Sequence, residues 1–151
     1  SEHDPLVRMR GMVGLSLSPD TSVLEAKVRL ANRTPMTQTF LWWANVCAAV
    51  HDEYQSFFPP DVAYVADHAV RATMSFPLAK GTYYGIDYSN GGKGTDLTWY
   101  KNIPVPTSYM VRETKYDFFG GYDHKVSTGF VHVADRHVSP GKKTMDMGQP
   151  C

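Results

Sequence analysis

The chain has 151 residues, and its 15 lysine and arginine residues balance 15 aspartate and glutamate residues. This length can bury a core without disulfides or a structural metal. A formal net charge of zero gives no electrostatic footprint for nucleic acid or for an anionic membrane surface, so neither is a predicted partner. We expect one domain over residues 1–151, or a fragment of a larger one.

Sequence features also bear on the cellular compartment. No stretch approaches the roughly 20 consecutive apolar residues of a membrane span. The opening SEHDPLVRMR lacks the apolar centre of a secretory signal. With only Cys47 and Cys151 present, a disulfide framework is not expected and a reducing compartment is the simpler interpretation. These features predict a soluble, cytoplasmic protein.

The first predicted element is a hairpin. Apolar and charged residues alternate with period two from Val23 to Leu30, which predicts a half-buried strand. Residues 13–17 alternate in the same way, and SPDTS at 18–22 provides turn residues between the two runs.

Residues 40–54, FLWWANVCAAVHDEY, predict a second extended segment with two unlike faces. Side chains alternate across a strand, so the even positions 42 to 50 form an apolar face. The odd positions include Trp43, Asn45 and His51, which predicts a face that lines a cleft. The alternative is that these side chains are ordinary core residues.

The middle of the chain is less regular. Adjacent prolines at 59 and 60 predict a rim loop, because proline lacks a backbone donor. Residues 62–70 are compatible with a short helix or a strand. TYYGIDYS and DLTWYKNI flank NGGKG, which predicts another hairpin.

Strands are also predicted near the C-terminus. A loop with two prolines leads into a strand at 108–112, and FFGGYDH is interpreted as a bend. Residues 129–138 alternate as a strand, in which Phe130 and His132 share one face while Val131 and Val133 take the other. We therefore expect the valines on the core face and His132 toward a cleft or solvent. A last strand is expected at about 144–148.

These elements together predict an all-β fold. Aromatic residues make up 13% of the chain, and this composition favours strands. Nine or ten short strands without a long helix predict an antiparallel β-sandwich, with a jelly roll as the alternative. No internal repeat is visible.

Three histidine–aspartate neighbours suggest acid–base chemistry, but adjacent residues of a strand face opposite ways. Any working pair must therefore be assembled across strands. Histidine titrates near neutrality, which suits proton transfer. The catalytic candidates are His51, Asp52, Asp123, His124 and His132.

Aromatic residues with a few polar partners suit a sugar, which presents both C–H faces and hydroxyls. The candidate substrate-binding residues are Trp43, Asn45, Tyr54, Trp99 and Tyr122. No metal-ligand spacing, nucleophile elbow or phosphate-binding glycine loop occurs, so no cofactor is predicted.

The chain resembles an uncharacterised bacterial domain of unknown function. The resemblance is carried by the runs LANRTPMTQTFLWWANV, FFPPDVAYVADHA, TYYGIDYS, WYKNIPVPTSYMV, FFGGYDH and HVADRHVSPGKK, in this order. That domain precedes tetratricopeptide repeats in long proteins and is grouped with the galactose-mutarotase-like sandwiches. The resemblance implies a partial mutarotase-like sandwich with a concave face that handles carbohydrate.

Mutarotases use a glutamate base and a histidine acid, whereas His132 stands where the resemblance would place the glutamate. Their reaction is therefore not carried over. We expect a carbohydrate-associated domain, either a binding module or an enzyme with epimerase-like or glycosidase-like acid–base chemistry. The alternative is an assembly module that contacts tetratricopeptide repeats or a second copy of itself.

Overall fold

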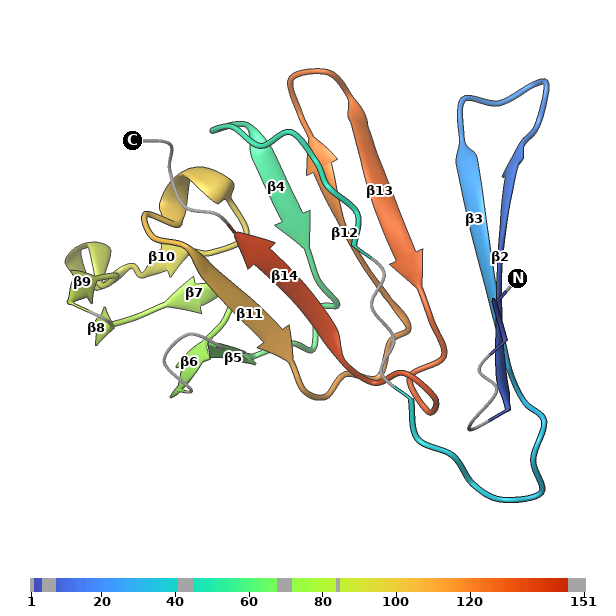
Figure 1. Cartoon of the computed structure of the whole chain (residues 1–151). Helices are drawn as coiled ribbons and strands as arrows, with labels where there is room; N and C mark the ends of the chain where they lie inside the picture. The colour runs from blue at the N-terminus through green and yellow to red at the C-terminus, as the bar shows by residue number, and fades with distance from the viewer. Residues whose placement is uncertain (1, 4–7, 41–44, 68–71, 84, 147–151) are drawn as a thin grey trace. The chain divides into compact units, whose positions relative to one another are not determined.

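A computed structural model describes residues 2–3, 8–40, 45–67, 72–83 and 85–146 (Figure 1). The chain divides into two compact units, Ser1–Val46 and Cys47–Cys151. Within the described residues, no helix is long and apolar enough to cross a membrane. The expectation of one domain stays a prediction.

The first unit is an antiparallel sheet of order β1-β2-β3, with bounds Glu2–His3, Met9–Leu17 and Leu24–Asn32. The predicted hairpin is confirmed, and its register places Val13 opposite Val28 and Leu17 opposite Leu24. The strand at Val23–Leu30 is not half-buried as expected, because Leu24 on its apolar face is 65% exposed.

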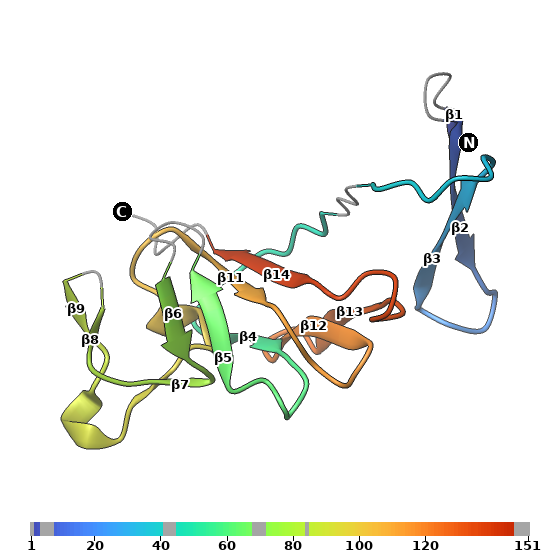
Figure 2. The same ribbon diagram turned by 90° about the horizontal axis from the view of Figure 1, so that it is seen from below.

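The second unit holds two larger antiparallel sheets, shown in Figures 1 and 2. The four-stranded sheet has the order β14-β11-β5-β6 and the three-stranded sheet the order β13-β12-β4. Their bounds are β4 Tyr54–Phe57, β5 Tyr64–Asp67, β6 Ala72–Ser75, β11 Thr107–Val111, β12 Phe118–Asp123, β13 Thr128–Val133 and β14 Lys142–Asp146.

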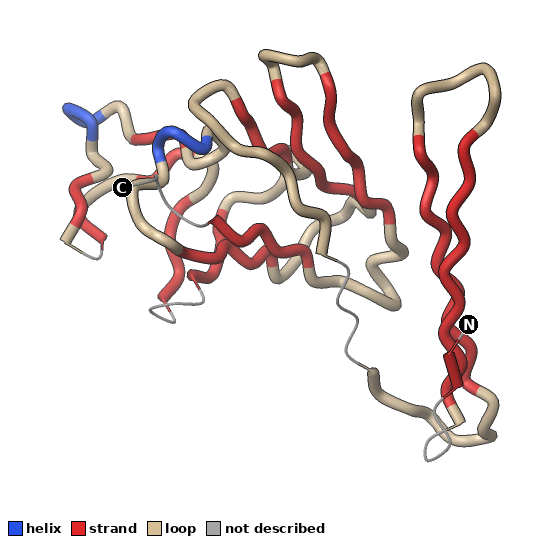
Figure 3. The backbone as a smooth tube through the Cα atoms, turned by 45° about the horizontal axis from the view of Figure 1, so that its top comes forward, coloured by secondary structure: helices blue, strands red, loops and turns tan. Residues whose placement is uncertain are grey.

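Two short ladders complete this unit. They are β7 Leu78–Ala79 with β10 Thr95–Asp96, and β8 Thr82–Tyr83 with β9 Ile86–Asp87. The only helical turns among the described residues are two 3-10 turns, Asn90–Gly92 and Tyr100–Asn102, drawn in blue in Figure 3. The predicted all-β, antiparallel fold class is confirmed.

The core of the second unit lies on the four-stranded sheet and its connections. Val65, Tyr109 and Val111 are each at most 2% exposed. Fully burying such a side chain contributes about 1.5–3 kcal/mol, so these strands hold the unit together. Phe58 joins the sheets, because its ring meets Phe76 edge-on at 5.0 Å and stacks on Phe119 of β12 at 6.1 Å.

The strand predicted over residues 40–54 is wrong in its described part. Residues 45–50 have no regular structure, and Val46 is 60% exposed rather than core. The ladder begins at Tyr54, opposite Asp123, directly after a turn closed by the Tyr54 N–H to the His51 carbonyl at 2.9 Å. Trp43 lies outside the described residues.

The bend predicted for FFGGYDH is also wrong, since β12 is the central strand of its sheet. The two glycines take extended backbone and leave room for aromatic rings from β4. A Cβ on Gly120 would collide with the Phe57 ring, and one on Gly121 with the Tyr54 hydroxyl. The glycines therefore serve close packing within a strand, not a turn.

The hairpin predicted around NGGKG does not form. β8 pairs with β9, while β10 pairs with β7. Asn90, Gly91, Gly92 and Gly94 all have positive φ, between 45° and 87°. These left-handed residues lie in and around a 3-10 turn, and the connection is longer than a tight two-residue turn.

Candidate functional site

His51 and Asp123 are 72 residues apart in sequence and meet across the sheet. The His51 Nε2 lies 3.0 Å from the Asp123 Oδ2. The other carboxylate oxygen accepts the backbone N–H groups of Lys125 at 2.9 Å and Val126 at 3.2 Å. Burial alone raises the pKa of Asp123, but the hydrogen bonds from His51 and the two N–H groups outweigh it and lower that pKa.

Both ring nitrogens of His51 are used within the chain. Its Nδ1 accepts the Glu53 N–H at 3.1 Å, so the hydrogen sits on Nε2, which donates to Asp123. The pair ties the start of β4 to the end of β12. Proton transfer by His51 and Asp123 stays a prediction, and Asp52, next to them, is an exposed turn residue.

Three rings lie close together near the end of β12, on the face of the sheet opposite to Asp123. We call these residues, Trp99, Tyr122 and His124, the aromatic cluster. His124 stacks on Trp99 at 5.1 Å between ring centroids and 25° between planes. Tyr122 meets His124 edge-to-face at 4.9 Å and 82°. Tyr122 is 38% exposed and His124 is also exposed, so the cluster faces solvent. Lys101 places its Nζ 5.1 Å from the Trp99 ring centroid.

Strand pairing positions these rings. Gln55 of β4 lies opposite Tyr122 of β12 and forms an isolated bridge with Trp99 on its other side. The His124 N–H donates to the Glu53 carbonyl at 3.1 Å, which fixes the residue after β12. Gly129 faces Tyr122, and a Cβ there would lie 3.0 Å from the Tyr122 ring, so the missing side chain makes room for it.

A directed chain of hydrogen bonds orients His124. The Thr98 hydroxyl donates to Asp96 at 2.7 Å, so its oxygen accepts the Gln55 amide N–H at 3.0 Å. The Gln55 carbonyl oxygen then faces His124 and accepts from its Nε2 at 3.1 Å. Among the described residues no hydrogen-bond partner is seen for Nδ1 of His124, an exposed residue, so this nitrogen remains available as an acceptor.

Gln55, Thr98 and Lys101 were not predicted as site residues. The contacts of Gln55 lie 43 and 69 positions away in the sequence, at Thr98 and His124. No local pattern identifies an amide with such partners. Lys101 had a weak signal, because it stands two residues from the candidate Trp99 in WYK.

Other predicted site residues lie elsewhere. Tyr54 is only 7% exposed and packs over Gly121, so it is a core residue and not a surface platform for a substrate. Asn45 is exposed on the irregular stretch in the first unit. Trp43 lies outside the described residues.

His132 sits apart from the cluster, on β13 opposite Phe119. Its ring lies 5.3 Å from the Phe119 ring and is half-buried. Burial, followed by the positive charge of Lys142, lowers its pKa. Val131 and Val133 are 61% and 69% exposed, so the predicted core face of this strand is reversed. The reason is that Phe119, on the same face as His132, packs inward on Phe58.

The described residues contain no group of three or more His, Cys, Asp or Glu side chains placed to hold a metal ion. No solved structure matches the chain. Residues 1–149 match a family described as a domain of unknown function, DUF5107. The match covers nearly the whole chain, which therefore belongs to this family.

Proposed function

We propose that this domain binds carbohydrate at the aromatic cluster, as part of a larger tetratricopeptide-repeat protein of the cytoplasm with a mutarotase-like sandwich. The single observation that carries the binding proposal is the exposed Tyr122 ring beside the Trp99–His124 stack, with the free Nδ1 of His124 next to it. An aromatic face suits the C–H surface of a sugar. The imidazole nitrogen can accept from a hydroxyl.

The geometry supports binding over catalysis. His51 commits both ring nitrogens inside the chain, and hydrogen bonds favour the ionised form of Asp123. His132 lies on the inward face of β13, next to Phe119, while the aromatic cluster faces outward. The ionised Asp123 cannot donate a proton, and the pair already has a structural role in bracing β4.

Calorimetric titration with a panel of mono- and oligosaccharides tests this proposal. Tyr122→Ala removes an exposed ring of the aromatic cluster and should weaken binding roughly threefold to tenfold, about 0.7–1.4 kcal/mol. Tyr64→Ala is the matched control, because Tyr64 is a 67% exposed tyrosine on the other sheet. No heat with any sugar, or equal loss in both variants, would reject the proposal.

A second candidate function is assembly through the first unit. One face of the β2–β3 hairpin is apolar except for Asn32 at its end, and Val13, Leu15 and Leu24 on it are 58–69% exposed. Exposed apolar patches of this kind mark contact surfaces. If two copies associate there, light scattering should show a dimer that Leu15→Glu dissociates and Ser16→Glu, on the opposite face, does not.

A further inference from the structure

β13 forms one edge of the three-stranded sheet, and among the described strands it pairs with β12 alone. The ladder to β12 continues one residue beyond the strand, where the Ala134 N–H donates to the Asp117 carbonyl at 2.9 Å. In a strand, the backbone groups of successive residues point to alternate sides. The even-numbered residues of β13 therefore bond to β12, and the backbone groups of Gly129, Val131 and Val133 point away from it.

The other edges of the two larger sheets are better protected against pairing with another chain. At the opposite edge of the same sheet, the Ser56 N–H of β4 donates to the Thr98 carbonyl at 2.8 Å. In the four-stranded sheet, one edge strand, β14, carries Lys142 and Lys143, and the other, β6, has only four residues. β13 has six residues and contains no proline, lysine, arginine, aspartate or glutamate.

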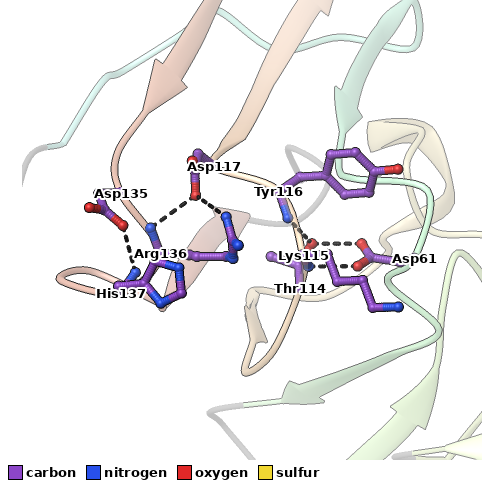
Figure 4. A network of polar contacts seen from close by, with 8 residues as sticks. All are labelled: Asp61, Thr114, Lys115, Tyr116, Asp117, Asp135, Arg136 and His137. Carbon is purple, nitrogen blue, oxygen red and sulfur yellow. Dashed lines mark hydrogen bonds and ion pairs between the residues drawn. The ribbon is translucent and has the colours of Figure 1, made fainter.

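The cationic side chain that follows β13 does not protect its free edge. Arg136 donates to Asp117, just before β12, from its backbone N–H at 2.9 Å and from its guanidinium at 3.4 Å (Figure 4). Arg136 is therefore held on the β12 side of the strand. The outward-facing valines of β13, Val131 and Val133, are 61% and 69% exposed.

We propose that β13 pairs with β13 of a second copy of this chain, antiparallel and about a two-fold axis, and so joins two three-stranded sheets into one. The free backbone groups all belong to odd-numbered residues, so an antiparallel copy must also present odd-numbered residues. Only the register with Val131 opposite its counterpart in the second copy engages all three residues, because it also places Gly129 opposite Val133.

This register makes the strand complementary to itself, which is why a second copy is the partner we infer. Side chains alternate across a strand, so pairing odd with odd residues keeps the exposed valines of both copies on one face. Phe130 lies opposite His132 of the second copy on the other face. No lysine, arginine or carboxylate of the strand meets a like charge, which would be destabilising. The surface is separate from the β2–β3 hairpin, so the inference does not depend on assembly through the first unit.

Light scattering and hydrogen exchange of the full chain over a dilution series test this pairing. A dimer should form at high concentration, and in it the amides of Gly129, Val131 and Val133 should become protected. The amides of Phe130 and His132 bond to β12 and should be protected at every concentration. A dimer formed by the β2–β3 hairpin would leave the three odd-numbered amides unprotected, so the alternation identifies the interface.

Substitutions give a second readout. Val131→Lys places two ammonium groups opposite each other in the proposed register and should raise the dimer dissociation constant roughly fivefold or more. Val138→Lys is the matched control, because Val138 is a 64% exposed valine outside β13. A monomer at every concentration, or a dimer with the odd-numbered amides unprotected, would overturn the inference. Protection of those amides that persists in the diluted monomer, or an equal effect of the two substitutions, would overturn it as well.

Discussion

Replacing Gly121 by alanine tests how β12 is held in the middle of its sheet. A Cβ at this position would collide with the Tyr54 hydroxyl and would approach the ring carbon Cζ to 2.7 Å. Tyr54 is 7% exposed at the start of β4, so its ring cannot move aside without losing buried packing. Overpacking of this kind costs about 1–3 kcal/mol.

Urea unfolding followed by tryptophan fluorescence measures this cost. Gly14→Ala is the matched control, because Gly14 is also a strand glycine and a Cβ there meets nothing within 4 Å. Tyr54→Phe removes the colliding oxygen, so combining it with Gly121→Ala should cost less than the sum of the two single changes. The reasoning is refuted if Gly121→Ala is as mild as Gly14→Ala, or if the double variant is simply additive.

Three further predictions concern buried or site-forming hydrogen bonds. Thr107→Val removes the hydroxyl that donates to the buried Asp67 at 2.7 Å, and should cost about 1–3 kcal/mol in urea unfolding. Because the pKa of Asp123 is lowered in the folded chain, its carboxylate stabilises the fold at pH values above the ordinary pKa of 3.8. This stabilisation is lost as the pH falls through the folded pKa, so His51→Ala should make the free energy of unfolding less dependent on pH in acid. Thr98→Val breaks the chain of hydrogen bonds that orients Gln55, and should weaken sugar binding without changing an exposed ring; unchanged calorimetric affinity would contradict the role of that chain.

Sequence reasoning succeeded where local pattern decides structure. Residues 13–17 and 24–30 alternate and enclose a turn, and they form the expected hairpin. It failed at residues 118–123, because the pattern of two adjacent glycines suggests a bend. Their real constraint is the pair of aromatic rings from β4 that lie over them, which only tertiary structure reveals.

The same limit applies to the candidate site. Strand parity predicts opposite faces for Asp123 and His124. The contact of His51, which precedes the turn before β4, with Asp123 on β12 joins residues that are distant in the sequence. The role of Gln55 could not be predicted, because it depends on hydrogen bonds to Thr98 and His124, which are distant in the sequence. The expected site on residues 43–51 depended on a continuous strand, and residues 45–50 do not form one.

The most direct test of carbohydrate binding is an NMR titration of the full chain with a panel of oligosaccharides, following the side-chain resonances of the aromatic cluster. We expect at least one sugar to shift the Tyr122 and His124 ring resonances and the Trp99 indole resonance, while Tyr64 stays unchanged. Resonances that remain still with every sugar, or that move only outside the cluster, would contradict the proposed function.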